Sequence, residues 1–239
     1  QLITGENQTV SVTTFAKPVT LRLKVDPALN ARLVSIYYIA DDGALDFIGG
    51  TYANGEITAD IDHFSKYAAL EYIKTFEDVP SDHWAKDVIT ELAAKRIVTG
   101  TSDLGFEPER HVTRAEFTAL LVRALRLTDK GSIPFSDVSA SDWFYPEISI
   151  AVQAGITDGK SESTFAPEAS ITREEMVSML ARAYEKVHHA PELPSAKAFD
   201  DEDFISPWAA AYINNAKALG LIEGREDNLF VPQGLGTRA

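Results

Sequence analysis

Phe76-Glu77-Asp78-Val79 opens a pattern that closes at Thr113-Arg114-Ala115-Glu116, and the chain contains this pattern three times. In each copy a Trp follows the opening, a Gly lies sixteen positions after the Trp, and a Phe-x-Pro begins six positions after the Gly. A Thr-Arg pair stands five residues after each Pro. Landmarks that keep their order in three copies indicate an internal repeat, in which one structural unit is used several times.

The three copies place the same residue types at nearly the same intervals. The Asp, Trp, Gly and Arg landmarks are Asp78, Trp84, Gly100 and Arg114, then Asp137, Trp143, Gly159 and Arg173, then Asp201, Trp208, Gly224 and Arg238. The third copy carries an acidic run at 200–203 and one extra residue before its Trp. It stops at Ala239, two residues after Thr237, so we expect its second helix to be missing.

Each repeat is predicted to form a helix, a loop and a second helix. Apolar residues at helical spacing follow each Trp, so we interpret the three Trp side chains as mainly buried. Gly155 and Gly220 stand where a helix ends in a left-handed residue, whereas Arg96 occupies this position in the first repeat. The first helix of that repeat must therefore end in another way.

The second helix is predicted to begin at the Thr-Arg pair. Thr113 with Glu116, and Thr172 with Glu175, form capping boxes, in which the Thr side chain accepts from the N3 amide and the Glu reaches back to the Thr amide. An apolar stripe follows each box. A single unit cannot bury such a stripe alone, so the repeats must pack on one another.

An Arg in the first helical turn is unfavourable, because a cation there opposes the helix dipole at a cost of up to about 1 kcal/mol. Three such Arg residues in register suggest a use, and a helix N-terminus with an Arg beside it suits a carboxylate or phosphate. The alternative is that each Arg pairs with a nearby acid. On the first interpretation, Arg114→Ala and Arg173→Ala weaken ligand binding without loss of stability.

The pattern F-x-D-V, W, G, F-x-P, T-R-A-E resembles the S-layer homology (SLH) domain of bacterial surface proteins, over residues 76–239. The resemblance implies mostly α-helical repeats in a pseudo-threefold arrangement around a central helix bundle. It also implies non-covalent attachment of an S-layer or S-layer-associated protein to the secondary cell-wall polymer, through pyruvylated N-acetylmannosamine bound in grooves between repeats. The implied ligand-binding residues are the twelve Asp, Trp, Gly and Arg landmarks given above.

Each of these residue types also has a structural interpretation. The Trp side chains could belong to the core, the glycines could form turns, and Asp78 and Asp137 could cap helices. In a binding groove the same residues would stack on a sugar ring, admit backbone amides close to the ligand and accept from sugar hydroxyls. Both interpretations remain open at this point.

Residues 1–74 predict an antiparallel β-sandwich, so the fold class is α+β with several domains. Alternating, β-branched segments lie at 9–12, 19–25, 33–39, 45–51, 56–61 and 66–72. Asp41-Asp42-Gly43 and Asn54-Gly55 are hairpin turn signals. The segment His63–Ala68 resembles the closing strand of β-domains that precede SLH repeats. We interpret this domain, which shows no site, as a spacer, and expect repeats at 75–131, 132–195 and 196–239.

Composition excludes several functions. The chain has no Cys, which removes disulfides, thiol nucleophiles and thiolate metal sites. A net charge of −14 opposes non-specific binding to nucleic acid or anionic membranes, and no apolar run is long enough for membrane insertion. The five His form no zinc motif, and the acidic run at 200–203, a candidate for Ca²⁺, lacks an EF-hand pattern. We expect no metal and no cofactor.

We therefore expect a non-enzymatic, extracellular cell-wall anchor, and a piece of a longer protein, since the chain starts at Gln1 without a leader. Two alternatives remain. The chain could be the anchor portion of a larger extracellular glycoside hydrolase, or the repeats could be a protein–protein assembly module that self-associates in a surface array.

Overall fold

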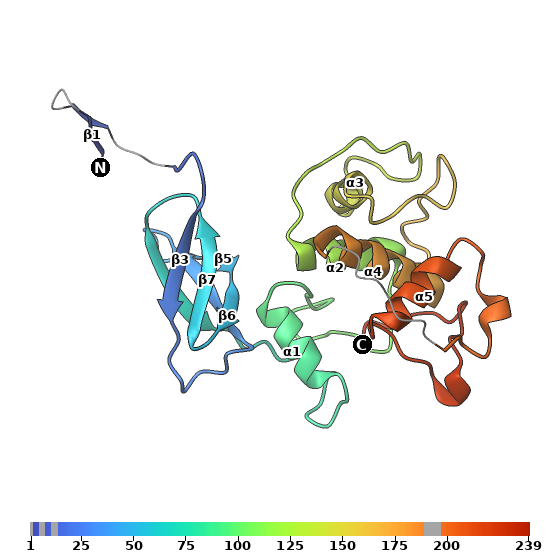
Figure 1. Ribbon diagram of the computed structural model, residues 1–239. Coiled ribbons are helices and arrows are strands. Elements are labelled where there is room, and N and C mark those ends of the chain that lie inside the picture. Colours follow the sequence, from blue (N-terminus) through green and yellow to red (C-terminus); the bar gives the residue numbers. More distant parts are fainter. Residues whose placement is uncertain (1, 5–7, 11–13, 189–196) are drawn as a thin grey trace. The chain divides into compact units, whose positions relative to one another are not determined.

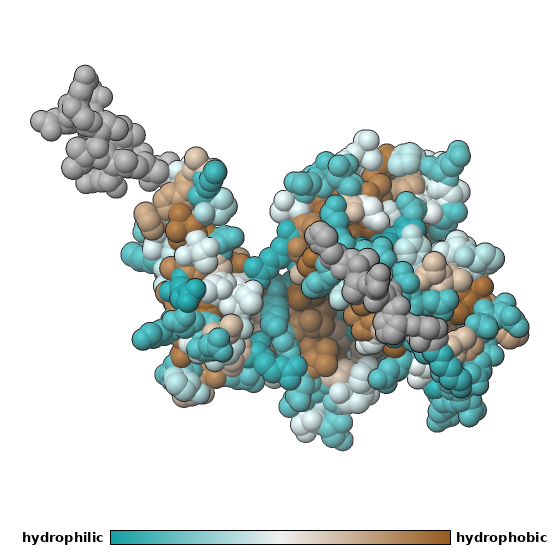
Figure 2. Space-filling view, viewed as in Figure 1, coloured by the Kyte–Doolittle hydropathy of each residue, from teal (hydrophilic) through white to brown (hydrophobic). Residues whose placement is uncertain are grey.

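The computed structural model describes residues 2–4, 8–10, 14–188 and 197–239. The chain forms two compact units, residues 1–106 and residues 107–239. The division falls inside the first repeat, so the sheets and the first helix of that repeat share one unit (Figure 1). Hydrophilic residues cover much of the visible face of each unit (Figure 2).

The strands that the structure describes in the first unit are all paired antiparallel. A short sheet joins β1 (Leu2–Thr4) to β2 (Gln8–Val10). Two three-stranded sheets follow, and their strand orders are β3-β7-β6 and β5-β4-β8. The strand bounds are β3 Val19–Lys24, β4 Val34–Ile39, β5 Leu45–Gly49, β6 Thr51–Ala53, β7 Glu56–Ile61 and β8 Lys66–Glu71. The predicted antiparallel sheets are confirmed, although the expected segment 9–12 lies partly outside the described residues.

Glycine and asparagine residues set the turns of these sheets. Asn54 and Gly55, between β6 and β7, both have positive φ (52° and 81°), as a tight hairpin turn requires. The expected strand 45–51 is interrupted at Gly50, whose φ of 135° carries the chain from one three-stranded sheet to the other. Apolar side chains from both sheets form one core: Val25, Val34, Ile36, Ile57 and Ala59.

Helix α1 (Lys86–Ala94) is tied to the sheets by residues that the other repeats lack. Arg96, which follows the helix with a φ of 57°, stacks on the ring of Tyr72 at 4.2 Å. Glu91 pairs with Arg32 and with Lys95, each at 2.5 Å. The residues at the positions of Glu91, Lys95 and Arg96 are Ile150, Ala154 and Gly155 in the second repeat. The first repeat therefore accepts a left-handed arginine whose side chain contacts the sheet.

The described part of the second unit contains four α-helices: α2 (Arg114–Leu125), α3 (Tyr145–Gln153), α4 (Arg173–Val187) and α5 (Ala210–Ala218). Two 3₁₀ turns, η1 (Glu202–Phe204) and η2 (Glu226–Asn228), belong to the third repeat. Both predicted capping boxes are confirmed, at the start of α2 and of α4. Gly155 and Gly220 adopt the predicted left-handed conformation, with φ of 74° and 69°.

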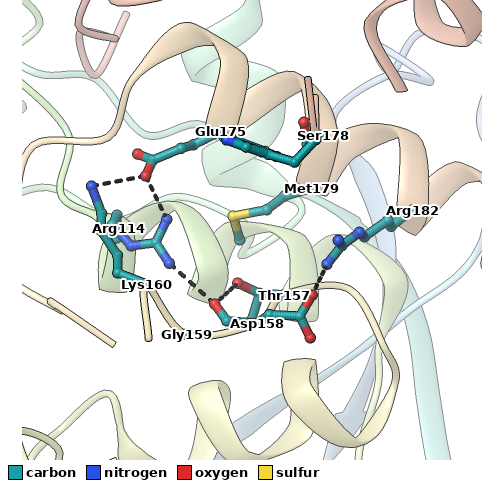
Figure 3. Close-up of a pocket in the computed structure, with 10 residues that line it drawn as sticks. Arg114, Thr157, Asp158, Gly159, Lys160, Glu175, Ser178, Met179 and Arg182 are labelled. Carbon is teal, nitrogen blue, oxygen red and sulfur yellow. Dashed lines mark hydrogen bonds and ion pairs between the residues drawn. The ribbon is translucent and has the colours of Figure 1, made fainter. Parts of the chain in front are cut away.

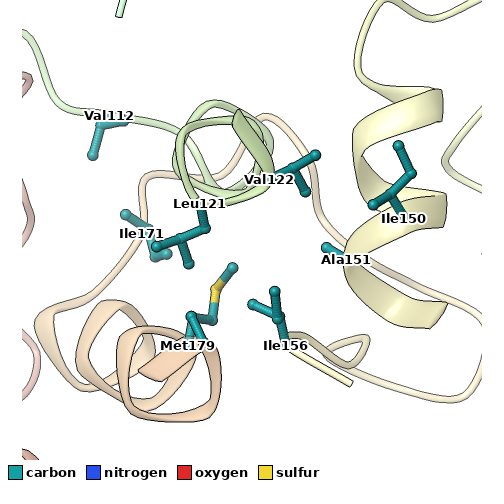
Figure 4. Close-up of a cluster of buried hydrophobic side chains, with 9 residues drawn as sticks. Val112, Leu121, Val122, Ile150, Ala151, Ile156, Ile171 and Met179 are labelled. Atoms are coloured by element: carbon teal, nitrogen blue, oxygen red, sulfur yellow. The ribbon is translucent and has the colours of Figure 1, made fainter. Parts of the chain in front are cut away.

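The core of the second unit is built by helices of different repeats. Leu121 and Val122 of α2, Ile150 and Ala151 of α3, and Met179 of α4 pack in one buried cluster (Figure 4). The apolar stripes after the two capping boxes therefore pack together, as the sequence requires.

The segments before the helices also connect the repeats. Single β-bridges join His111 to Thr237, Thr113 to Ser170, and Thr172 to Leu235. These bridges link the segments at 111–113, 170–172 and 235–237 in all three pairings, so each Thr-Arg segment of the second unit is held by residues of another repeat.

Candidate functional site

A pocket of about 370 Å³ in the second unit brings together residues of all three repeats (Figure 3). Arg114 comes from the signature of the first repeat, Gly159 from the loop of the second, and Trp208 from the third. All three are predicted site residues, and the sequence separates them by 45 and 49 positions. Helix α4 supplies one wall, and the segment 157–160 supplies another.

The side chain of Arg114 is buried, and all three of its guanidinium nitrogens contact acceptors of the protein. Its side chain is only 5% exposed and stacks on the ring of Phe165 at 4.8 Å. Its Nε donates to the carbonyl of Phe165 (3.0 Å), one terminal nitrogen donates to the carbonyl of Asp158 (3.2 Å), and the other lies 3.2 Å from the carboxylate of Glu175. Burial lowers the pKa of Arg114 from its ordinary value, although the charge of Glu175 acts in the opposite direction.

These contacts favour the alternative that the sequence left open, in which the signature Arg pairs with nearby groups. They contradict the expectation that stability holds when Arg114 is removed, because its loss would leave the carbonyls of Asp158 and Phe165 without this donor and would remove one of the two cations beside Glu175. The contacts also explain why a cation is tolerated at the positive end of α2: the second repeat supplies the compensating charge and acceptors.

Glu175 lies between two cations. Its Oε1 is 3.2 Å from Arg114 and 2.8 Å from Lys160, and its Oε2 accepts from the amide of Thr172 at 3.0 Å in the capping box. Burial raises the pKa of this carboxyl, but the hydrogen bonds from Lys160 and Thr172 and the charge of Arg114 outweigh it, so the net pKa is lowered. Glu175 is therefore an anion in the folded protein at neutral pH.

The far end of the pocket is a second ion pair. Arg182 of α4 binds the carboxylate of Asp158 at 2.6 Å and stacks on the ring of Tyr212 at 4.8 Å. Between the two charged ends lies Met179, whose thioether side chain points into the space between the labelled charged groups (Figure 3). The pocket thus offers cations at both ends and an apolar middle.

The three landmark Asp residues do not cap helices and do not line the pocket. Asp137 accepts from the amides of Phe165 (2.9 Å) and Ala166 (2.7 Å), and Asp201 accepts from the amides of Phe230 and Val231, both at 2.7 Å. Asp78 accepts from the amide of Phe106 at 2.8 Å. The Asp side chains therefore hold the Phe-x-Pro segments of their own repeats.

The backbone conformation of the Phe-x-Pro segments explains why they need these hydrogen bonds to the Asp side chains. The middle residue of each Phe-x-Pro has positive φ: 59° at Glu107, 60° at Ala166 and 58° at Val231. Such a conformation is costly for a residue with a side chain, and most of all for a β-branched Val. Burial raises the pKa of Asp137, but the amide hydrogen bonds outweigh it and lower the net pKa, as expected for a carboxylate that stabilises a strained turn.

The three landmark glycines have no positive φ, so turn formation does not explain them. A Cβ on Gly159 would lie 2.4 Å from the carbonyl oxygen of Ser161 and 2.5 Å from the Phe135 ring. At Gly100 it would lie 2.3 Å from the carbonyl oxygen of Ser102, and at Gly224 it would lie 3.1 Å from the backbone of Asn228. Close approach of the loop's own backbone, together with the first Phe of the repeat, is the reason for a Gly here.

The interpretation of the Trp residues as core is wrong. Trp84, Trp143 and Trp208 are 75%, 54% and 52% exposed. Each begins the apolar pattern of a helix, but it lies in the turn before that helix, where helical spacing does not apply. All three side chains are accessible to solvent. Trp208 lines the pocket. Stacking of Trp84 and Trp143 on a ligand stays a prediction.

Arg173 and Arg238 repeat parts of the arrangement of Arg114. Arg173 donates to the carbonyl of Glu223 at 2.8 Å and stacks on Phe230 at 5.1 Å, as Arg114 does with Asp158 and Phe165. Arg238 lies 3.4 Å from the carboxylate of Glu116, and this contact is equivalent to that of Arg114 with Glu175. In sequence, Asp158 and Glu223 both precede the landmark Gly, so the contacts are equivalent.

Sequence reasoning missed four charged residues of the pocket: Asp158, Lys160, Glu175 as a partner of Arg114, and Arg182. Lys160 directly follows a landmark Gly, and Glu175 was assigned only its capping role. The position of Arg182, two turns into α4 on the side that faces the loop, could have been found by helical periodicity. Among the described residues, no His, Cys, Asp and Glu group is arranged to hold a metal, and no helix is long and apolar enough to cross a membrane.

Residues 75–118, 134–177 and 198–239 match the S-layer homology domain family. The chain is 43% identical over 231 residues to an amylopullulanase of Thermoanaerobacterium thermosulfurigenes, across 95% of this chain and 12% of that protein. It is 44% identical to exoglucanase XynX of Acetivibrio thermocellus, across 69% of this chain and 15% of that protein. It is 32% identical to the surface-layer 125 kDa protein of Lysinibacillus sphaericus, across 61% of this chain and 12% of that protein.

The chain thus spans about an eighth of the length of these relatives. Domains of this family anchor surface proteins to the cell wall. The chain belongs to the S-layer homology family, and it carries three such domains after an N-terminal β region in a cell-surface, cell-wall-associated protein.

Proposed function

We propose that this chain anchors a larger surface polypeptide by binding a carboxylate-bearing saccharide of the secondary cell-wall polymer, with pyruvylated N-acetylmannosamine as the ligand. The observation that carries the proposal is the pocket of Arg114, Gly159 and Trp208, in which one residue from each repeat meets the others. Such a pocket exists only when the repeats are packed together. It therefore supports a binding site between repeats and not one within a single repeat.

The chemistry of the pocket fits an acidic sugar. Its charged lining residues are Arg114, Lys160 and Arg182 against Asp158 and Glu175, a local excess of one positive charge in a chain of net charge −14. A volume of about 370 Å³ lies in the range of small-ligand pockets. Trp208 offers an aromatic face for a sugar ring, and the cations offer charge-assisted hydrogen bonds to a carboxylate.

We extend the proposal to the arrangement of the repeats, as a pseudo-threefold assembly around central helices. The bridges between the segments at 111–113, 170–172 and 235–237 support it, because each segment is joined to both of the others. The amides of Arg114, Arg173 and Arg238 also donate to carbonyls of a neighbouring repeat in the same way, to Ala169, Gly234 and Arg110 respectively.

The chain itself is proposed to be non-catalytic, with any chemistry in the remainder of the full-length protein. A specific observation favours a glycoside hydrolase as that remainder: the identity with the amylopullulanase extends over 95% of the chain and so includes the β region as well as the repeats. Self-association in a surface array is the competing function, and the relationship to surface-layer proteins supports it.

Co-sedimentation with purified cell-wall sacculi tests the proposal. We expect the protein to pellet with intact sacculi and to stay in the supernatant after chemical removal of the secondary polymer from the same preparation. Binding that survives removal of the polymer would contradict a polymer anchor. Analytical ultracentrifugation without sacculi separates the alternative, because an assembly module would form oligomers on its own.

A further inference from the structure

The three cationic side chains of the pocket differ in how exposed they are, and so in how accessible they are to a ligand. The side chain of Arg114 is 5% exposed, that of Arg182 is 22% exposed, and that of Lys160 is 40% exposed. Arg182 is fixed between the carboxylate of Asp158 and the ring of Tyr212. Lys160 therefore presents the most accessible positive charge to the pocket.

Arg114 cannot turn toward a ligand without breaking the site. Its nitrogens hold the carbonyls of Asp158 and Phe165 and the carboxylate of Glu175, and the carbonyl of Asp158 belongs to the segment that carries Gly159 and Lys160. A guanidinium offers five N–H donors in a rigid fork, and here all three nitrogens face protein acceptors. The role that these contacts define for Arg114 is to position the loop.

Lys160 is held by a contact that it can exchange. Its ammonium lies 2.8 Å from Oε1 of Glu175, and an ammonium has two further N–H donors. When Lys160 turns to a ligand carboxylate, Glu175 keeps Arg114 at 3.2 Å and the amide of Thr172 at 3.0 Å. The exchange therefore leaves no buried charge without a partner, which is the condition for it to cost little.

We infer that Lys160 makes the direct contact with the carboxylate of the ligand and so determines specificity for an acidic saccharide, whereas Arg114 acts as a positioning residue that holds the loop. The inference rests on the proposed function. The same loop position, directly after the landmark Gly, is occupied by Arg225 in the third repeat and by Thr101 in the first. The repeats therefore differ in their capacity to bind an acid, and the Thr101 loop lacks it.

Isothermal titration with two probes separates the two roles. The first probe is the methyl glycoside of 4,6-O-pyruvyl N-acetylmannosamine, and the second is its methyl ester, which lacks the charge and is larger by one methyl group. We expect Lys160→Gln to weaken binding of the acid about ten- to a hundredfold, the value of one charge-assisted hydrogen bond, and to leave binding of the ester unchanged. Lys160→Arg should restore preference for the acid.

Arg114→Lys should weaken binding of acid and ester by the same factor, because displacement of the loop removes contacts that do not depend on charge. Lys186→Gln, an exposed position on α4, removes the same charge away from the pocket and is the control. Equal binding of the acid by Lys160→Gln and wild type would overturn the inference and leave the proposed function standing. Failure of the wild type to bind the acid would contradict both.

Discussion

The guanidinium of Arg114, in the signature of the first repeat, lies 3.2 Å from the carboxylate of Glu175, in the signature of the second. Both side chains are nearly buried, at 5% and 11% exposure. The two residues are those that the repeat pattern keeps, so the signature encodes a contact between repeats. The first signature supplies the Arg for a contact with the second repeat and the Glu for a contact with the third, where Arg238 lies 3.4 Å from Glu116.

Arg114→Ala should lower the free energy of unfolding by about 3–5 kcal/mol, the usual cost of removing one partner from a buried ion pair. Urea denaturation followed by circular dichroism measures the change, and Lys186→Ala serves as the exposed control. An unchanged midpoint in Arg114→Ala would show that the pair with Glu175 contributes nothing net, and the positioning role would be untenable.

Two glycines of the second repeat should respond differently to alanine. At Gly159 the new Cβ meets backbone and an aromatic ring within 2.5 Å, so Gly159→Ala should cost about 1–3 kcal/mol and displace the loop of the pocket. At Gly155 nothing lies within 4 Å, so only the positive φ opposes the substitution, at about 1 kcal/mol.

Saccharide affinity distinguishes the two glycine variants, because only the first alters the pocket. Measured by calorimetry, Gly159→Ala should lose affinity and Gly155→Ala should retain it. Equal affinity in both would remove Gly159 from the site.

The sheet and the first repeat should be thermodynamically coupled through Arg96 and Tyr72, whose guanidinium and ring are 4.2 Å apart. Arg96→Ala keeps a side chain at positive φ but deletes the stacking, and Tyr72→Leu deletes the ring. In a double-mutant cycle of unfolding free energies we expect a coupling of about 0.5–1 kcal/mol. A coupling of zero would return the β region to the role of a simple spacer.

The repeat unit, the sheets, the capping boxes and the helix ends at Gly155 and Gly220 could be predicted from sequence, because each depends on local spacing or on one residue's backbone freedom. The interruption of 45–51 at Gly50 could not, since it depends on which sheet each half joins. The pairing of Arg114 with Glu175 could not be separated from a ligand role either, because the sequence shows an Arg at a helix start but not what the next repeat places beside it.

Acid should destabilise the folded protein through its paired carboxyls. The pKa of Glu175 is lowered below 4.5, its ordinary value, and so its ion pairs contribute stability that is complete above that value and is lost as the pH falls through the folded pKa. We expect the melting temperature to decrease as the pH is lowered below about 5. The melting temperature of Glu175→Gln should depend less steeply on pH in this range. Glu185→Gln, exposed on the same helix, is the charge-matched control.

If the melting temperature of Glu175→Gln fell with decreasing pH as steeply as that of the wild type, proton uptake by other groups would account for the loss of stability. The ion pair of Glu175 with Arg114 and Lys160 would then have no measurable part in stability at acidic pH.

The central claim is that recognition of a carboxylate in the pocket, and not the overall charge, holds the chain on the wall. Titration of the wild-type protein with the pyruvylated N-acetylmannosamine glycoside, at low and at moderate salt, tests it most directly. Since the chain carries a net charge of −14, salt should screen long-range repulsion and weaken the short-range contact only modestly. We predict binding with a shallow salt dependence, and no measurable binding of the same sugar without its ketal. Equal affinity for the bare sugar, or a steep loss of affinity with salt typical of a basic surface, would contradict the account.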